Sequence, residues 1–363
     1  MVHDLSTVES ASSLRFSESL TVNLGIQGPL TSSLLNSEEA LLRALIAAGA
    51  QPVAPLDLAV RAALDFEALA SRLDALEDLG FELERHPAFG IRLVGFPERL
   101  IPEEIGARLP RERTVGRSIL IFTETTSTHD VAARLAAQGA KEGSVILAET
   151  QTAGRGRRGR VWASPAGKGV WFTVILRPHL PPSAASRITV MAGVAVARAL
   201  RRTTGLPLHI KWPNDLLCRG RKLAGILTEI GLEEGRLAYA LLGVGVNVNL
   251  VADDLPEDLR GCATSLKQEA GRAFSRATLA AEMLGEIEQG LVRLDDTGFP
   301  AVADEWIALD DTLGRQVSVA GPDGRRRGLA AGLDTDGALL LRLDEGRTER
   351  IHGGDVEVEK IRE

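Results

Sequence analysis

Cysteine, lysine and long apolar runs are all scarce in this sequence of 363 residues. Its two cysteines, Cys218 and Cys262, cannot build a disulfide framework, and they lack the clustering that a zinc site requires. No segment approaches the roughly 18 uninterrupted apolar residues of a membrane span, and the N-terminus lacks a secretory signal pattern. These absences predict a cytoplasmic protein with reduced thiols and no membrane partner.

Basic charge is also in deficit. The chain has 42 Lys and Arg against 49 Asp and Glu, a formal net charge of −7. This balance excludes a chain whose overall charge alone would attract nucleic acid or anionic lipid, so any such binding requires a local basic patch. A length of 363 residues with 44% hydrophobic residues predicts a globular protein of more than one domain.

The N-terminal part divides into two regions. Residues 1–36 are rich in Ser and Thr without periodicity, which predicts a disordered tail. Residues 37–97 have the spacing of three short helices and a β-hairpin, with Asp65 expected to cap the third helix and Gly80 to end it. This outline resembles a winged helix-turn-helix, a common DNA-binding module. However, ten acidic residues face five basic ones between Glu38 and Phe96, and such a surface repels phosphates, so the charge predicts against DNA binding.

The remainder divides into three further regions. Pro97, Pro102 and Pro110 indicate a linker over residues 98–114. Strand and helix patterns then alternate through a large α+β domain over residues 115–300. Short strands between glycine-rich turns over residues 301–363 predict a small β-barrel.

The segment from Gly154 to Arg160, with sequence GRGRRGR, holds four arginines and three glycines. It contains G-x-G-x-x-G, but a loop with Ser164-Pro165 follows instead of the helix that a dinucleotide site needs. Arginine forks bind carboxylate and phosphate oxygens, and glycines let the backbone fold over an anion. We therefore expect an anion-binding loop that is disordered when empty. The alternative is a solvated basic loop or one that binds RNA without chemistry.

Two further segments strengthen the case for an active site. Residues 211–217, KWPNDLL, place Lys211 at a strand end that is turned by Pro and Asn. Residues 243–249, GVGVNVN, form a strand whose alternate glycines are expected to keep one face open for a flat ligand. Asn247 on this strand offers amide donor and acceptor groups.

Taken together, these motifs resemble the biotin protein ligases. The arginine loop, KWPNDL, Lys222-Leu223-Ala224-Gly225-Ile226-Leu227 and GVGVNVN occur in that family's order, within residues 115–363. The resemblance implies an α+β fold with a catalytic mixed sheet like that of class II aminoacyl-tRNA synthetases, and a C-terminal SH3-like barrel. It also implies that biotin and Mg·ATP form biotinyl-5′-AMP, and that biotin then passes to a lysine of a biotin carboxyl carrier protein or domain.

The resemblance assigns roles residue by residue. Lys211 and Arg157 are the expected catalytic residues, because adenylation joins a carboxylate to a triphosphate and requires fixed cations. The expected biotin-binding residues are Ser127, Thr128, His129, Gln151, Gly154, Arg155, Gly156, Arg157, Trp162 and Lys211. The expected ATP or adenylate contacts are Arg158, Arg160, Asn214, Asp215 and Asn247. No protein metal site is expected, although Mg²⁺ accompanies ATP, and a homodimer is possible.

Two alternatives from other classes remain. Some family members use the N-terminal module to repress biotin-synthesis genes, so this chain could be a bifunctional ligase and repressor. Lipoate ligases share the fold but do not normally combine GRGRRGR with KWPND.

Overall fold

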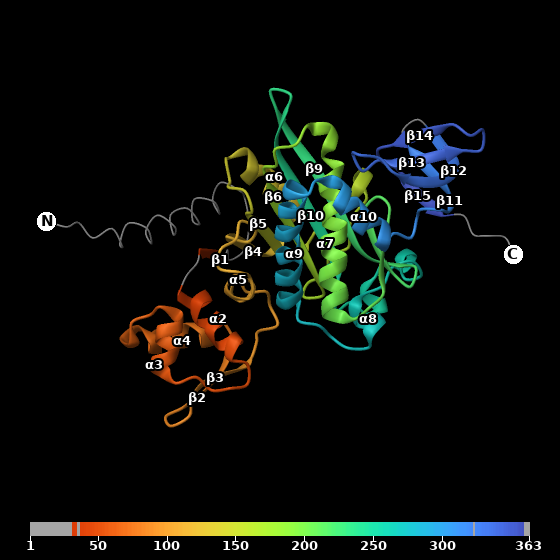
Figure 1. Cartoon of the computed structure of the whole chain (residues 1–363). Helices are drawn as coiled ribbons and strands as arrows, with labels where there is room; N and C mark the ends of the chain where they lie inside the picture. Colours follow the sequence, from red (N-terminus) through yellow and green to blue (C-terminus); the bar gives the residue numbers. More distant parts are fainter. Residues whose placement is uncertain (1–30, 35–36, 322–323, 359–363) are drawn as a thin grey trace.

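The computed structural model describes residues 31–34, 37–321 and 324–358. An N-terminal group of helices with a β-hairpin, a central mixed sheet with helices, and a C-terminal antiparallel sheet follow one another along the chain (Figure 1). The predicted α+β class is thereby confirmed. Most of the predicted tail over residues 1–36 lies outside the described residues.

The N-terminal region is a small helical unit with its own core. It comprises α2 (Ser37–Ala48), α3 (Pro55–Ala62), α4 (Phe66–Asp78) and a hairpin of β2 (Glu82–His86) and β3 (Gly90–Gly95). Leucines at helical spacing, such as Leu41, Leu45, Leu69 and Leu73, pack together because they share the inner faces. Asp65 stands at the N-cap of α4 but makes no side-chain cap hydrogen bond, so its predicted capping role is not observed.

The predicted linker over residues 98–114 is packed and partly helical. Helix α5 (Pro102–Arg108) is buried along most of its length. Arg113, which follows it, bonds both carboxylate oxygens of Glu39 on α2 at 3.1 Å. Buried Arg276 pairs with Glu149 at 2.6 Å and also donates to the Glu98 carbonyl. These buried polar contacts fix the N-terminal unit to the central domain, a connection that proline spacing could not reveal.

The central sheet has the strand order β1-β4-β5-β6-β10-β9-β8-β7. Its strands are β1 (Thr31–Leu34), β4 (Ser118–Thr125), β5 (Val145–Gln151), β6 (Gly169–Leu176), β7 (Leu208–Lys211), β8 (Asp215–Cys218), β9 (Arg221–Glu233) and β10 (Arg236–Asn247). Strand β1 pairs antiparallel with β4, so residues 31–34 of the predicted tail are extended. An edge strand presents unpaired backbone groups, which an extended segment can satisfy without an apolar pattern.

Helices cover both faces of this sheet. Helix α6 (Thr128–Ala137) packs on one face with Ile146 and Ile175. Helices α7 (Ser186–Thr204), α9 (Arg276–Asp296) and α10 (Phe299–Leu309) contribute to the main core with Val145 and Val174. The alternation of Val145 and Ile146 between the two cores is the two-residue period of a strand. Helix α10 runs across the expected boundary at residue 300, because Trp306 is fully buried in the main core.

One described helical segment, Pro182–Thr204, is long and apolar enough to cross a membrane, but 67% of its apolar window is buried inside the protein. This burial is what a core helix requires, and the segment contains α7.

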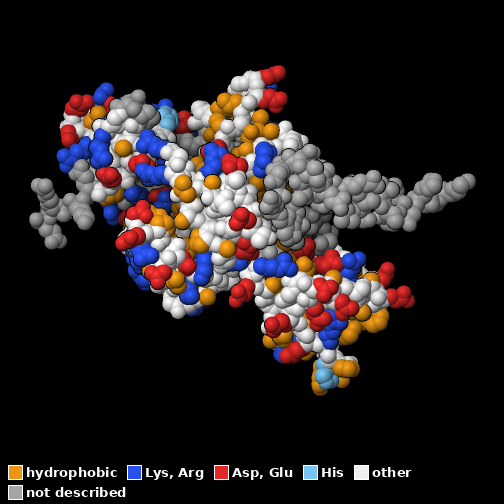
Figure 2. Space-filling model, turned by 180° about the vertical axis from the view of Figure 1, so that it is seen from behind, with side chains coloured by type: hydrophobic (Ala, Val, Ile, Leu, Met, Phe, Trp, Pro, Cys, Tyr) orange, Lys and Arg blue, Asp and Glu red, His pale blue; other side chains and the backbone are white. Residues whose placement is uncertain are grey.

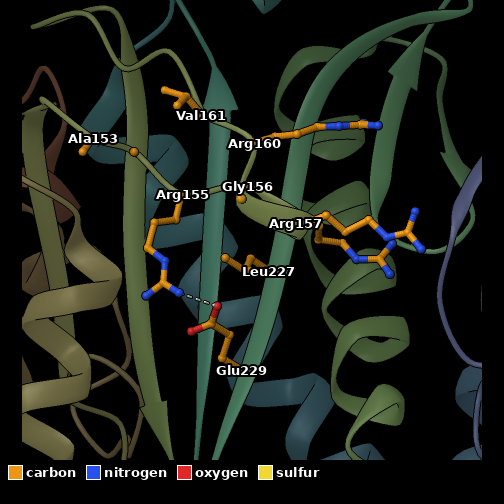
Figure 3. Close-up of a pocket in the computed structure, with 11 residues that line it drawn as sticks. Ala153, Arg155, Gly156, Arg157, Arg160, Val161, Leu227 and Glu229 are labelled. Carbon is orange, nitrogen blue, oxygen red and sulfur yellow. Dashed lines mark hydrogen bonds and ion pairs between the residues drawn. The ribbon is translucent and has the colours of Figure 1, made fainter. Parts of the chain in front are cut away.

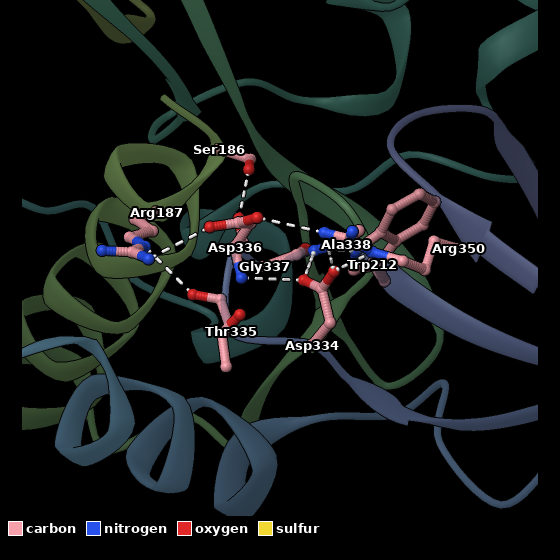
Figure 4. Close-up of polar contacts among 9 residues, drawn as sticks. All are labelled: Ser186, Arg187, Trp212, Asp334, Thr335, Asp336, Gly337, Ala338 and Arg350. Atoms are coloured by element: carbon pink, nitrogen blue, oxygen red, sulfur yellow. Dashed lines mark hydrogen bonds and ion pairs between the residues drawn. The ribbon is translucent and has the colours of Figure 1, made fainter. Parts of the chain in front are cut away.

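The C-terminal sheet has the strand order β14-β13-β12-β11-β15. Its strands are β11 (Gln316–Gly321), β12 (Gly324–Leu333), β13 (Leu339–Leu343), β14 (Thr348–Ile351) and β15 (Asp355–Val358). The turn between β12 and β13 docks on α7: Arg187 pairs with Asp336 at 3.0 Å, and Ser186 donates to the Asp336 carbonyl (Figure 4). Trp212 Nε1 donates to the Gly337 carbonyl at 3.3 Å. The C-terminal sheet therefore has a defined place beside the KWPND segment.

Candidate functional site

A cavity of about 320 Å³ lies over the central sheet, between α6, β9 and β10 and the arginine loop. It brings together most of the side chains that the sequence singled out. The predicted site residues that line it are Ser127, Thr128, His129, Gln151, Arg155, Gly156, Arg157, Arg160, Trp162, Asn214, Asp215 and Asn247. Gly154 and Arg158 line an adjoining hollow within the loop itself, and Lys211 lines neither space.

One end of the cavity is polar and is built on the N-terminus of α6. Ser127 caps the helix by accepting from the His129 backbone N–H at 3.2 Å. Gln151 Oε1 accepts from the Thr128 N–H at 2.9 Å, and Gln151 Nε2 donates to Ser164 Oγ at 2.8 Å. A helix N-terminus has free N–H groups, so this end can serve a ligand with hydrogen-bond acceptors.

His129 belongs to a chain of ionisable side chains at the side of the cavity. Its imidazole is buried, with Nε2 lying 3.3 Å from Glu229 Oε2. Glu229 also pairs with Arg155 at 2.8 Å (Figure 3), and Arg155 pairs with Asp130 at 2.9 Å. The hydrogen bond from His129 lowers the pKa of Glu229 despite partial burial, and Arg155 acts in the same direction. Glu229 belongs to none of the motifs that indicated the site.

Glycines on the floor of the cavity make room for aromatic side chains of the protein itself. A Cβ atom on Gly225 would lie 2.8 Å from the Trp162 ring, and one on Gly245 would lie 2.9 Å from it. A Cβ on Gly243 would lie 2.9 Å from His129 Nδ1. The alternate glycines do line the cavity, but Trp162 and His129 of the protein itself lie against them.

The lysine at the cavity is Lys222 rather than Lys211. Lys222 Nζ lies 2.7 Å from Asp215 Oδ1 and 5.3 Å from the centroid of the Trp162 ring. Lys211 is on β7, the last strand of the sheet, and is not among the lining residues. Strand β9 lies further into the sheet, and it carries Gly225 as well as Lys222 beneath Trp162. The signal was present in the sequence, since Lys222 begins the quoted motif KLAGIL.

The arginine loop, expected to be disordered without a ligand, is held by carboxylates in the structure. Arg158 and Arg160 both pair with Asp355 of the C-terminal sheet, at 3.4 and 2.5 Å. Arg157 differs, because its hydrogen bonds go to neutral oxygens: Asn214 Oδ1 at 3.2 Å and the Gly354 carbonyl at 3.4 Å. Burial lowers the pKa of Arg157, although Asp215 and Asp355 act to raise it. Arg157 is thus a partly desolvated cation suited to meet an anion.

Comparison with known proteins explains this arrangement. The pattern of the Biotin/lipoate A/B protein ligase family matches residues 120–247, and that of the Biotin protein ligase C terminal domain matches residues 312–358. The chain is 38% identical over 219 residues to the Bifunctional ligase/repressor BirA of Bacillus spizizenii, covering 60% of this chain and 67% of that protein. It is 36% identical over 220 residues to the Biotin--[acetyl-CoA-carboxylase] ligase of Mycobacterium tuberculosis, covering 59% and 79%. This chain belongs to the biotin protein ligase family. The identification from sequence motifs, and the biotin–protein ligase activity that it implied, are confirmed.

A solved structure supports the same conclusion for the fold. The biotin protein ligase of Aquifex aeolicus in complex with biotin and ATP superposes with a TM-score of 0.57 at 27% identity, covering 67% of this chain and 98% of that one. The match leaves about a third of this ligase outside the superposition.

The other end of this ligase's cavity is apolar. Leu255, Leu259 and Ala263 line it and cluster with Trp171. Asn247 lies beside them, with Nδ2 donating to the Thr264 carbonyl at 3.0 Å. A flat apolar ring with polar edges suits this end. Within the described residues no group of three or more His, Cys, Asp or Glu could hold a metal ion.

Proposed function

We propose that this ligase adenylates biotin with ATP and transfers the biotinyl group to a lysine of a biotin carboxyl carrier protein or domain. The observation that carries the proposal is the meeting of two cations, Lys222 and Arg157, in one cavity between a polar end and an apolar end. A ligand with a polar head, an apolar body and a carboxylate fits a cavity with these polar, apolar and cationic parts.

The roles follow from the positions. The ureido ring of biotin binds at the polar end, near Ser127, Thr128 and Gln151, and Trp162 covers its apolar part. Lys222 takes the role that the sequence assigned to Lys211, and its ammonium holds the biotin carboxylate. The adenine of ATP binds at the apolar end beside Asn247. Arg157 and Asn214 approach the α-phosphate, and Arg158 and Arg160 approach the other phosphates when ATP displaces Asp355.

In the first step, a biotin carboxylate oxygen attacks the α-phosphorus of ATP, and the bond to the β-phosphate oxygen breaks with departure of pyrophosphate. Lys222 and Arg157 reduce the repulsion between the two anions and stabilise the charge that develops at the α-phosphate. A magnesium ion that accompanied ATP would supply further neutralisation of the phosphate charge. In the second step, the neutral amine of the carrier lysine attacks the acyl carbon, the bond from that carbon to the AMP oxygen breaks, and the nitrogen releases a proton to solvent as the amide forms and AMP departs.

A pair of lysine variants tests the assignment. Purified protein with biotin, MgATP and a cognate carrier domain should yield biotinylated carrier, detected by mass spectrometry. Lys222→Ala should slow adenylation by roughly 10²–10³, the range for loss of one electrostatic stabiliser. Lys211→Ala is the matched control and should stay within about threefold. A larger effect of Lys211→Ala than of Lys222→Ala would assign the catalytic role to Lys211. Absence of transfer by the wild-type protein would refute the proposed reaction.

A second candidate function comes from the names of the relatives. The similar Bacillus proteins are called bifunctional ligase/repressor, so a role in repression deserves a test. Selection of DNA from a random pool by the adenylate-loaded protein at physiological salt is decisive. We expect no enrichment, because the N-terminal unit is acidic.

Offering lipoate in place of biotin tests the other alternative, and we expect biotin to be strongly preferred.

A further inference from the structure

Glu149 on β5 and Arg276, the first residue of α9, form a largely buried ion pair outside the lining of the active-site cavity. Their side chains are 14% and 5% exposed, and Arg276 Nη1 lies 2.6 Å from Glu149 Oε2. Neither residue belongs to a motif that indicated the site. Burial of two charges carries a desolvation penalty that offsets their attraction, so the groups that the pair holds in place matter more than its own energy.

Glu149 is linked to the polar end of the cavity. It stands two residues before Gln151 on the same strand. The Gln151 side chain accepts from the Thr128 N–H at 2.9 Å and donates to Ser164 Oγ at 2.8 Å. Because a strand held in a sheet transmits displacement along its length, a shift of Glu149 moves Gln151 as well.

Arg276 is linked to the apolar end of the cavity through Gly169, the first residue of β6. Arg276 Nη1 donates to the Gly169 carbonyl at 3.5 Å. Gly169 pairs across the sheet with Asn247, and a Cβ atom on Gly169 would lie only 2.0 Å from the Trp171 ring. Asn247 and Trp171 both line the cavity, so the position of Gly169 sets that of two lining residues.

The chain just before Arg276 makes a second link to the same end. The Phe274 N–H donates to Asn249 Oδ1 at 3.0 Å, and Asn249 Nδ2 donates to the Phe274 carbonyl at 2.9 Å. The Asn249 N–H donates in turn to the Lys168 carbonyl at 2.6 Å. Arg276 is therefore tied by two routes to the strand ends that carry the apolar part of the cavity.

The segment that leads out of the N-terminal unit restrains the pair itself. The Leu100 N–H donates to Glu149 Oε1 at 2.6 Å, and Arg276 Nη2 donates to the Glu98 carbonyl at 2.6 Å. Arg276 Nη2 also donates to Glu149 Oε1 at 3.3 Å. Both oxygens of the carboxylate and both terminal nitrogens of the guanidinium are thus engaged, which leaves the two side chains one arrangement.

We propose that Glu149 and Arg276 are positioning residues for adenylation, which set the distance between the biotin end and the nucleotide end of the cavity. The inference rests on the proposed function. The biotin carboxylate must meet the α-phosphate, and a misplacement of about 1 Å can slow a reaction by roughly 10²-fold. Biotin alone occupies one end and does not depend on this distance. A ligand that spans both ends does depend on it.

The test compares biotin with a spanning ligand, biotinol-5′-AMP, in which a methylene group replaces the biotinyl carbonyl of the adenylate. Calorimetry gives the affinity for each. Glu149→Gln should weaken binding of the spanning ligand by about tenfold and binding of biotin by less than about twofold, since only the first is coupled to both ends. Single-turnover adenylation should slow by roughly 10²-fold.

Glu288 on α9 provides the matched control. It accepts from the N–H groups of Thr114 and Val115 at 3.1 and 2.6 Å, so it also fastens the segment after the N-terminal unit to the central domain. Its hydrogen bonds among the described residues do not reach β5 or β6. Glu288→Gln should change both affinities and the adenylation rate by less than about twofold.

A double variant protects the test against misfolding. Glu149→Gln alone leaves the Arg276 guanidinium without this carboxylate, whereas Glu149→Gln combined with Arg276→Gln removes both charges. The double variant should show the same selective loss for biotinol-5′-AMP, because two neutral amides do not restore the fixed arrangement. Equal losses for biotin and the spanning ligand in both variants would overturn the positioning role, as would unchanged affinity for the spanning ligand. Failure of the proposed function would appear differently, as absence of adenylate formation by the wild-type protein.

Discussion

The arginines of the N-terminal unit and the arginine Arg157 of the central loop differ in the groups that they contact. In the N-terminal unit, Arg43, Arg72, Arg85 and Arg92 each pair with a carboxylate of the same unit. In the arginine loop, Arg155, Arg158 and Arg160 also pair with carboxylates, whereas the side-chain hydrogen bonds of Arg157 within the described residues go to neutral oxygens. The space-filling view shows the consequence, with red and blue side chains interspersed over the N-terminal unit (Figure 2). The shape of a domain therefore predicts anion binding less well than the groups that its arginines contact.

The largest effect expected is on stability and comes from a buried arginine outside the active site. Arg113→Met should lower the free energy of unfolding by about 3 kcal/mol, the lower end for a broken buried ion pair, because Glu39 keeps Arg43 as a partner. Denaturant unfolding measures the change. Arg72→Met, which removes the exposed pair with Glu38, is the control and should cost less than about 1 kcal/mol. Equal losses would show that burial does not distinguish these pairs.

Arg157→Gln should have a large effect on activity and a small effect on stability, in contrast to Arg113→Met. We expect adenylation to slow by roughly 10²–10³, because a preorganised cation near the α-phosphate is lost. Stability should change by less than about 1 kcal/mol, since no carboxylate of the described residues hydrogen-bonds to Arg157 and the removed charge was partly desolvated. Single-turnover formation of the adenylate and thermal unfolding provide the two measurements. A stability loss as large as that of Arg113→Met would mean that Arg157 is structural.

Gly245→Ala should produce an intermediate effect at the active site. The added methyl group would lie 2.9 Å from the Trp162 ring, so the indole must shift over the cavity. Overpacking of this kind costs about 1–3 kcal/mol, and we expect biotin to bind about tenfold more weakly by calorimetry. Gly261→Ala is the control, because a Cβ there meets no atom within 4 Å. Unchanged biotin affinity in Gly245→Ala would show that Trp162 does not contribute to biotin binding.

The smallest effect concerns pH and Glu229. Its pKa is lowered in the folded protein by His129, so its contribution to stability is present above its ordinary pKa of 4.5 and is lost as pH falls through the lower folded value. The side chain is 39% exposed, so Glu229→Gln should cost less than about 1 kcal/mol at pH 7. The difference from the wild-type protein should shrink below pH 4.5. A constant difference from pH 7 to pH 3 would contradict the ionic role of Glu229.

Much of the fold could be predicted because periodic apolar positions record which face of an element is buried. Helix α7 and strands β4, β6 and β10 all lie within residues 115–300, where alternating strand and helix patterns were predicted. Helix α5 was missed because prolines marked its segment as a linker, while tertiary ion pairs hold it in place. Strand β1 was missed because its pairing depends on backbone groups of β4 rather than on its own side chains.

The motifs that form the site could be predicted from the sequence, but the positions of their side chains relative to the cavity could not. The sequence offered Lys211 and Lys222 within two adjacent motifs, and only the strand order shows which lies over the cavity. Likewise, the pairing of Asp355 with Arg158 and Arg160 joins residues almost 200 positions apart. Contacts between distant segments leave no periodic trace in a single sequence.

The position of Trp162 over the glycine floor gives the protein an intrinsic optical reporter. Of its four tryptophans, Trp171, Trp212 and Trp306 are at most 2% exposed, whereas Trp162 is only partly buried and lines the cavity. A ligand that enters the cavity displaces water chiefly from Trp162. The indole emission of the unlabelled protein should therefore shift as biotin binds, and each turnover can be followed by fluorescence without any added dye.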